Sequence, residues 1–513
     1  MRQGSIAPGT PDPYVPSKSG QYGAMSGEPD SRADGRNVRV QGRSHMRIRA
    51  GPFLRALLLT ALLTPCPAIY GLEPDTSAAP AKPAAAPGES SAEDKTSEQA
   101  PTPPPPPPAA PAPVPGLWKQ ETLTSDWGGT RSHWKEKGIE LDFAFTQFAQ
   151  GVAAGGIQTG AAGTGRFQSA FKVDLGKLVG WKFWSFDLET ETRFGGPLLG
   201  GTGTISPVNT AALIPAAAGS AFTISSLNLT RIFPIDLQKG NLIALSFGRF
   251  NLLDLSDENF FGGGGIERFW NIAQIGPLTV LREVPFITNL VSFAYVRRGE
   301  PIFTLAVLDP NDHSLNPGLS NLFAQGVTFS PGINLPAKYF GKTAKHSFGA
   351  AVTTKEYTPF DAIRQIVLPG PPIHPLQPER GSWAANYTFR QYIVERGKGD
   401  GWGFFGQVAF ANKSTSPISQ FVNVGLGGNG LSKSRRRDEF GLAYAYTDFS
   451  DVLKNNLATI SLGRLLPEHQ GEVFYNFHIT PWLRFTPDLQ IIRPTRPVAG
   501  IAIIPGVRLE VIL

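Results

Sequence analysis

A strict two-residue alternation of charged and apolar side chains constrains the fold of this chain most. It is clearest in FWSFDLETETRF, residues 183–194, where every second position is charged: Asp187, Glu189, Glu191 and Arg193. Successive side chains of a strand point to opposite faces, so this segment has one charged face and one apolar face. A soluble sheet turns its apolar face to a core, whereas a membrane barrel turns it to lipid and the charged face to a watery lumen. One strand does not separate these two interpretations.

The alternation recurs along the rest of the chain, which favours the barrel. Further examples are RFQSAFKVDL (166–175), GSWAANYTFRQ (381–391), EFGLAYAYTDF (439–449) and PGVRLEVIL (505–513). About sixteen or seventeen such segments are separated by clusters of Gly, Pro, Asn and Asp, which are typical of turns. We therefore predict an all-β fold, a transmembrane antiparallel β-barrel over residues 141–513. Because single-chain bacterial barrels have even strand numbers, we expect about 16 strands.

The N-terminal third carries signals for export. Residues 46–71, MRIRAGPFLRALLLTALLTPCPAIYG, have the basic start, apolar middle and small residues of a secretory signal peptide, which makes 1–45 an upstream or disordered segment. Residues 72–116 are so rich in Pro and Ala that we predict a disordered, semi-rigid tether. The only Cys and all three Met precede this tether, so no disulfide framework is expected. The predicted location is the outer membrane of a Gram-negative bacterium.

A short lead-in over residues 117–140 connects the tether to the barrel. In WGGTRSHWKEKG, residues 127–138, Trp127, Arg131 and Trp134 have helical spacing, which predicts a short periplasmic helix before the first strand. After residue 70 no stretch approaches the roughly 20 apolar residues that a membrane-spanning helix needs. We expect no cofactor and no metal, because DPNDHS (309–314) lacks the Gly and Glu of a calcium loop and the seven histidines form no close ligand pair.

Four stretches carry a more specific likeness. They are LTSDWGGTRSHWKEKGIELDFAF (123–145), LSFGRFNLLDLSDENFFGG (245–263), SRRRDEFGLAYAYTDFS (434–450) and GEVFYNFHITPWLRFTPDLQIIRPT (471–495). In this order they resemble the OprB family of carbohydrate-selective porins. The resemblance implies a sixteen-stranded barrel that admits sugars by diffusion, without energy coupling and without chemistry on the substrate. The chain departs from the family in its Pro-rich tether and in ending on Leu513 instead of an aromatic residue.

Residue parity along the strands predicts which side chains face the lumen. A passage that favours neutral sugars should offer charged hydrogen-bonding groups to hydroxyls and aromatic faces to C–H patches. Besides the four charges of the opening strand, the same parity gives Lys172, Asp174, Arg390, Glu472 and Arg508. The alternative is that these charges form a ladder that only keeps the wall rigid and hydrated.

The segment GRFNLLDLSDENFFGGGGIERFW, residues 248–270, is the candidate for a loop that folds inward and narrows the pore. Its four consecutive glycines allow a tight path, and five side chains are candidates for the narrows: Asp257, Glu258, Glu267, Arg268 and Trp270. The alternative is an exposed extracellular loop with a solvated charge cluster.

Three other functions stay open at this stage. The channel could be a general or ion-selective porin. It could be a barrel enzyme acting on lipid or polysaccharide, since Asp187 and Glu189 lie about 7 Å apart along a strand. It could also link the outer membrane to the cell wall through the tether. The expected partners are a carbohydrate solute, outer-membrane lipid and the assembly machinery, with no nucleic acid; peptidoglycan contact and a homotrimer are left open.

Overall fold

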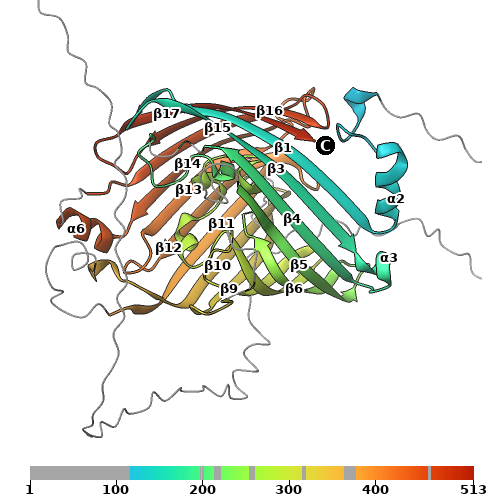
Figure 1. Ribbon diagram of the computed structural model, residues 1–513, viewed down its shortest axis with the longest axis horizontal. Coiled ribbons are helices and arrows are strands. Elements are labelled where there is room, and N and C mark those ends of the chain that lie inside the picture. Colours follow the sequence, from blue (N-terminus) through green and yellow to red (C-terminus); the bar gives the residue numbers. More distant parts are fainter. Residues whose placement is uncertain are drawn as a thin grey trace, which may run out of the picture. The chain divides into compact units, whose positions relative to one another are not determined.

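The computed structural model describes residues 116–196, 198, 201–212, 221–253, 260–314, 319, 321–362, 377–459 and 464–513. The predicted upstream segment, the signal peptide and all but the last residue of the tether lie outside these ranges. The described chain consists mainly of strands (Figure 1), and none of its helices is long and apolar enough to cross a membrane.

The strands form one closed antiparallel barrel. Each long strand pairs with its neighbour in sequence, and the ring closes because the first strand, β1, pairs with both β3 and the last strand, β17. The sixteen long strands are β1 Ile139–Val152, β3 Gly160–Asp174, β4 Trp184–Gly195, β5 Ala221–Asp236, β6 Asn241–Asn251, β7 Ile287–Arg297, β8 Glu300–Leu308, β9 Thr328–Tyr339, β10 Lys342–Tyr357, β11 Glu379–Gly397, β12 Asp400–Ala411, β13 Ile418–Asn429, β14 Glu439–Phe449, β15 Glu468–His478, β16 Leu483–Arg493 and β17 Gly500–Ile512. A three-residue strand, β2 (Ala154–Gly156), adds to the edge of β17. The predicted sixteen-stranded barrel is confirmed.

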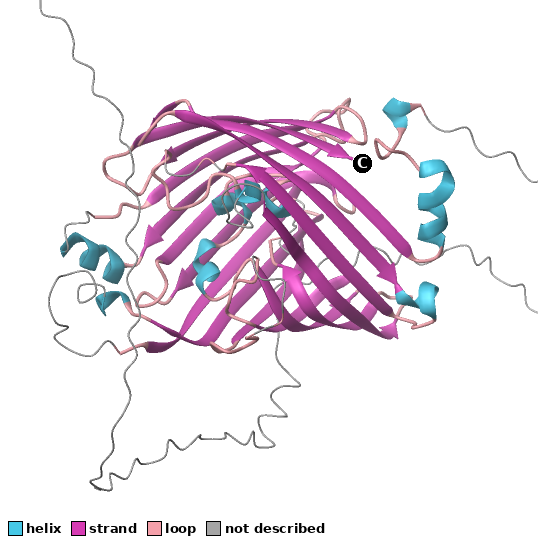
Figure 2. Ribbon diagram, in the orientation of Figure 1, coloured by secondary structure: helices cyan, strands magenta, loops and turns pink. Residues whose placement is uncertain are grey.

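Short helices lie in the connections. They are α2 Thr130–Glu136, α3 Leu175–Val179, α4 Ile272–Ile275 and α6 Asp451–Thr459, with 3-10 turns η1 Leu117–Lys119, η2 Trp127–Gly129, η3 Thr210–Ala212, η5 Gly263–Gly265, η6 Leu278–Arg282 and η7 Phe360–Ala362. Figure 2 shows that some of these helices lie within the ring of strands, while α2 and α3 lie at one end of the barrel.

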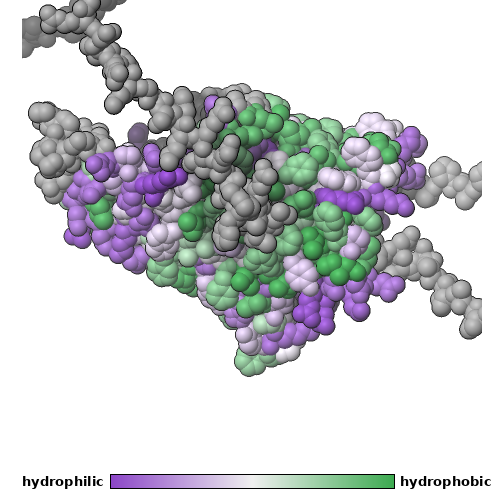
Figure 3. Space-filling view, turned by 90° about the horizontal axis from the view of Figure 1, so that it is seen from below, coloured by the Kyte–Doolittle hydropathy of each residue, from purple (hydrophilic) through white to green (hydrophobic). Residues whose placement is uncertain are grey.

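The two faces of the wall differ as the alternation predicts. On β13, Val422, Val424 and Leu426 are exposed on the outer face. Asn423, between them, is fully buried because its amide reaches into the barrel and donates a 2.7 Å hydrogen bond to the carbonyl of Ala273. Figure 3 shows the result on the outer surface, where apolar side chains dominate the middle and hydrophilic ones gather at the two ends. Such a band is the surface that faces lipid.

The lengths of the connections orient the barrel. At the end that carries α2, α3 and the C-terminus, three hairpins turn within two residues, at 298–299, 340–341 and 398–399. The opposite end carries the long connections, including 196–220, 252–286 and 358–378. Because outer-membrane barrels have short periplasmic turns and longer extracellular loops, the end with α2 and α3 is the periplasmic one.

The lead-in segment holds the last strand at its periplasmic end. The guanidinium of Arg131, on α2, donates hydrogen bonds of 2.8 Å to the carbonyl of Leu513 and 2.9 Å to that of Leu141. Trp118 stacks on Trp482 with ring centroids 6.3 Å apart. The lead-in segment therefore stabilises the contact between β1 and β17, where the barrel closes.

Candidate functional site

The described part of the connection between β6 and β7, residues 252–253 and 260–286, folds into the barrel. We call it the inward loop. Its aromatic side chains pack against the inner wall: Phe260 lies 4.7 Å from Tyr392, and Phe269 lies 4.8 Å from Phe474, between ring centroids. At Gly427 the approach is so close that an added Cβ would collide with the carbonyl of Phe260, so the wall needs glycine there. The inward loop thus occupies part of the lumen rather than extending into solvent.

Two buried wall residues anchor the inward loop. The carboxylate of Glu472, on β15, accepts hydrogen bonds from the backbone N–H groups of Trp270 (2.6 Å) and Asn271 (3.0 Å). Arg508, on β17, donates to the carbonyl of Arg268 (3.2 Å), and its guanidinium lies 5.5 Å from the centre of the Trp270 ring. Sequence analysis named all of these except Asn271. The side chains of Glu472, Arg508 and Trp270 are buried, so they hold the loop in place and have almost no surface facing the lumen.

In the connection between β4 and β5, the described residues 201–212 also fold inward. Thr210 donates 2.7 Å hydrogen bonds from both its N–H and its hydroxyl to the carbonyl of Trp270. Gln490 donates to the carbonyl of Val208 (2.9 Å), and Glu468 accepts from the N–H of Ile205 (2.6 Å). This loop was not predicted from the sequence, because residues 201–212 carry no charge. The only sequence feature that could have indicated an inward-folding loop is the long gap between the strands β4 and β5.

The opening strand, β4, forms a charged row with β3 on the inner wall. Glu191 is fully buried between Arg166 (2.5 Å) and Arg193 (2.9 Å). Next to this triad, Gln168 donates a 3.2 Å hydrogen bond to Glu189. Asp187, nearer the periplasmic end, is half-buried and stands opposite Lys172. Arg166 was missed, although it shares the parity of Lys172 on the same strand.

The remaining predicted residues are dispersed. Asp174 lies at the end of β3, where it caps α3 by accepting hydrogen bonds from the N–H groups of Gly176 and Lys177. Arg390 stands opposite Lys345 on β10. Glu267 and Arg268 lie in the inward loop, where Arg268 is 3.6 Å from Glu439. Asp257 and Glu258 lie outside the described residues.

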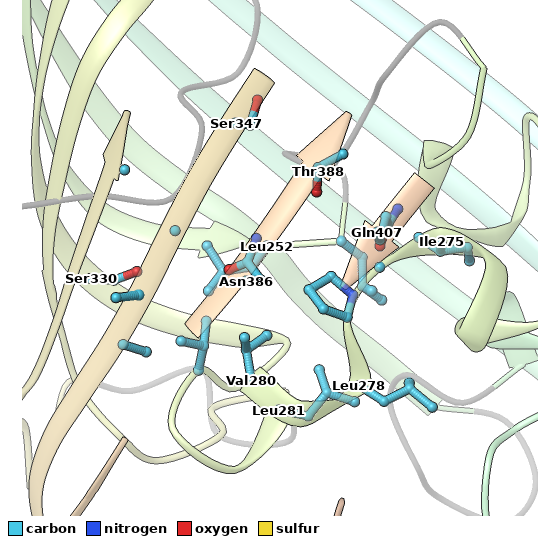
Figure 4. Close-up of a pocket in the computed structure, with 18 of the residues that line it drawn as sticks. Leu252, Ile275, Leu278, Val280, Leu281, Ser330, Ser347, Asn386, Thr388 and Gln407 are labelled. Carbon is cyan, nitrogen blue, oxygen red and sulfur yellow. The ribbon is translucent and has the colours of Figure 1, made fainter. Parts of the chain in front are cut away.

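The space left beside the inward loop is a cavity of about 180 Å³ against the inner faces of β8–β12 (Figure 4). One side is aliphatic and comes from the loop: Leu252, Leu253, Ile275, Leu278, Val280, Leu281 and Val284. The other side is neutral and polar and comes from the wall: Thr304, Ser330, Asn334, Ser347, Asn386, Thr388 and Gln407. None of the described residues that sequence analysis named lines this cavity. The expected charged lining is replaced here by amides and hydroxyls, and the loop adds two aromatic residues, Phe261 and Phe286, to its aliphatic side chains.

A row of hydroxyls extends the neutral polar surface around the wall. Ser185, Thr230, Ser246 and Ser292 are direct partners across β4, β5, β6 and β7. Thr230 and Ser246 hydrogen-bond to each other at 2.8 Å. The row runs from β4, one of the charged strands, to β7, which pairs with β8 at the edge of the wall that lines the cavity.

Glu283 fixes the end of the inward loop. Its side chain is fully buried, and one oxygen accepts a 2.6 Å hydrogen bond from the hydroxyl of Ser382 on β11. Its other oxygen has no hydrogen-bond partner among the described residues. Burial disfavours the charged carboxylate and raises the pKa of Glu283 to about 7.

The arrangement can bind and pass a small polar solute. It offers hydrogen-bonding groups on one side and an aliphatic surface on the other. Within the described ranges no three His, Cys, Asp or Glu side chains come together as a metal site.

Comparison with known proteins agrees with this architecture. The family described as "Carbohydrate-selective porin, OprB family" matches residues 158–511, more than half of the chain. Porin B of Pseudomonas aeruginosa is 21% identical over 437 residues, which cover 76% of this chain and 91% of that protein. The high-pH structure of Pseudomonas putida OprB superposes with a TM-score of 0.64 at 20% identity, covering 77% of this chain and 99% of that one. At that identity the structural likeness shows the fold.

Proposed function

The chain belongs to the OprB family of carbohydrate-selective porins, and on that premise we propose that sugars cross the barrel between the inward loop and the wall of β8–β12. The protein is a carbohydrate-selective channel of the outer membrane of a Gram-negative bacterium. We propose further that transport is passive diffusion of mono- or oligosaccharides, with no chemistry on the solute.

The cavity lining supports this proposal. A sugar has hydroxyls around its rim and C–H groups on its faces, so the amides of Asn386 and Gln407 suit the rim, and aliphatic side chains such as Leu281 suit a face. Neutral hydrogen bonds are weaker than charge-assisted ones, so a sugar held this way also leaves quickly. Conduction needs that balance between entry and exit.

We propose that the charged row forms a second polar surface along the path of the solute. Asp187, Glu189 and Lys172 offer both signs of charge on one wall, so an ion of either sign meets repulsion as well as attraction. A neutral sugar can hydrogen-bond to both signs without net repulsion. In this proposal Glu191, between its two arginines, stiffens the wall and does not touch the solute.

Uptake into liposomes tests the proposal. Purified protein should admit monosaccharides faster than disaccharides and trisaccharides, and the rate should saturate with sugar concentration. A charged sugar acid of similar size is the matched solute, and it should enter more slowly than its neutral parent. If all solutes of one size enter equally fast, a general porin replaces the proposal.

An ion-selective porin is the second candidate, favoured by the buried Arg166–Glu191–Arg193 triad and the charges beside it. It predicts a large ion conductance that sugar does not reduce. The enzyme hypothesis has less support, because family and fold are those of a channel and Asp187 and Glu189 lie side by side on one strand.

Several finer statements are proposals supported by the sequence alone. They are removal of residues 46–71 as a signal peptide, a periplasmic tether over 72–116 that reaches peptidoglycan, and recognition of 505–513 by the assembly machinery. Association of three barrels is a further proposal, which mass measurement of the extracted protein tests.

A further inference from the structure

Arg231 lies on the outer, lipid-facing surface of the barrel, among aromatic rings. It is the direct partner of Trp184 across β4 and β5, and its neighbours in sequence, Thr230 and Ile232, point inward. Its guanidinium carbon is 5.3 Å from the ring centre of Phe233, 5.6 Å from that of Trp184 and 5.9 Å from that of Phe183. Aromatic faces attract a cation at such distances. We call these three rings the aromatic cage.

The charge of Arg231 has no carboxylate partner in the described part of the chain. Its guanidinium donates a hydrogen bond to the backbone carbonyl of Lys182, which is neutral. Two other cations at the periplasmic end are paired within the chain: Lys239 with Asp236 at 2.8 Å, and Arg396 with Asp400 at 2.8 Å. An arginine left unpaired on an apolar outer surface needs a counter-charge from outside the chain, because a charge in such surroundings is costly unless it is paired.

The turn beside Arg231 is built around this contact. Phe183 has a φ of 65°, in the left-handed region that residues other than glycine rarely adopt. Its carbonyl accepts a 2.9 Å hydrogen bond from the N–H of Ile232, next to Arg231. The strained turn brings both the Phe183 ring and the Lys182 carbonyl to the guanidinium. Backbone strain of this kind persists where the surrounding structure requires it, which is common in ligand sites.

We propose that Arg231 and its aromatic cage form a binding site for the phosphate of a phospholipid headgroup in the periplasmic leaflet. The planar guanidinium can give two parallel hydrogen bonds to phosphate oxygens while the rings hold its position. Lys182, exposed beside it, adds a second positive charge. Exposed Trp181 and Phe233 lie where the acyl chains of the same lipid would begin, as aromatic residues do at membrane interfaces. Because it carries two cations, the site prefers an anionic lipid such as phosphatidylglycerol.

Native mass spectrometry of the full chain in detergent tests this site. The protein is titrated separately with phosphatidylglycerol, phosphatidylethanolamine and inorganic phosphate. Arg231→Gln should weaken the tightest phosphatidylglycerol site at least tenfold, because it removes the positive charge and the paired hydrogen bonds to phosphate. Phe233→Leu keeps the charge but removes one ring and should weaken it about threefold. Arg298→Gln removes one exposed cation from the β7–β8 turn, outside the cage, and should have no effect.

Each outcome bears on the proposal. Unchanged phosphatidylglycerol binding by folded Arg231→Gln overturns it, and so does an equal loss in Arg298→Gln, which would mean diffuse attraction to the whole rim. Displacement of the lipid by millimolar inorganic phosphate would assign the site to free phosphate and overturn its lipid part. If Arg231→Gln does not fold, as judged by heat-modifiable gel migration, the Phe233→Leu titration decides, and unweakened binding there overturns the proposal.

Discussion

Glu472 and Trp270 are joined by a 2.6 Å hydrogen bond between a buried carboxylate of the wall and a backbone N–H of the inward loop, across 202 residues of sequence. Arg508, on β17, contacts the same part of the loop: it donates a hydrogen bond to the backbone carbonyl of Arg268, and its guanidinium lies over the Trp270 ring. If sugars pass between the inward loop and the wall, as proposed, the width of that path depends on buried residues that the solute does not touch.

Replacing Glu472 with Ala should loosen the inward loop. The change leaves two buried N–H groups without their acceptor, which costs about 1–3 kcal/mol for each group. We expect a noisier open channel, larger ion conductance and faster uptake of trisaccharide relative to monosaccharide. Single-channel recording and liposome uptake measure these. Glu140→Ala, at the periplasmic end of β1, is the matched control and should leave both unchanged. A quiet Glu472→Ala channel of normal conductance would contradict the anchoring role.

Glu191 and Asp187, two acids of the same strand, should behave differently. Glu191→Gln leaves Arg166 and Arg193 buried without their shared counter-charge, and breaking a buried pair in this way costs about 3–5 kcal/mol. We expect lower unfolding free energy in detergent and urea. Asp187→Asn should leave stability nearly unchanged but shift the reversal potential in a salt gradient toward anion preference, because Asp187 is only half-buried. Equal stability of the two variants would contradict this division of roles.

Glu283 should make the barrel less stable as pH rises. Its folded pKa of about 7 lies above the ordinary value of 4.5, so the folded state binds more protons between these two pH values. The free energy of unfolding should fall by about 3 kcal/mol as pH rises from 4.5 to about 7, and level off above that pH. Urea unfolding at pH 4, 6 and 8 measures this. Glu283→Gln should remove this part of the dependence and exposed Glu356→Gln should not; identical pH profiles for wild type and Glu283→Gln would refute the assignment.

The barrel could be predicted from sequence because its signal is local and repeated. Each strand needs a lipid face, so parity within ten residues is enough to place Phe186 outward and Asp187 inward. The prediction of an inward loop over 248–270 rested on four glycines, and in the structure the described part of that loop folds inward, with Gly263 and Gly265 at positive φ.

The cavity could not be predicted in the same way. Its polar side comes from neutral residues such as Ser347 and Thr388, which attract no notice in a search for charges. Its aliphatic side comes from 272–284, which looks like ordinary apolar sequence until Glu472 and Arg508 hold the loop against the wall. Residue parity also cannot show what covers the inner face of a strand. It therefore predicted that both Glu472 and Asp187 line the lumen, whereas Glu472 is buried under the inward loop and Asp187 is only half-buried.

Sugar block of the single-channel current tests the central claim most directly. If neutral sugars bind between the inward loop and the wall, added monosaccharide should reduce the current along a saturating curve. The double variant Asn386→Leu, Thr388→Val removes polar groups from the cavity wall and should raise the half-saturating concentration about tenfold, the loss of one or two hydrogen bonds. A current that falls linearly with sugar concentration, and equally in wild type and variant, would contradict the account.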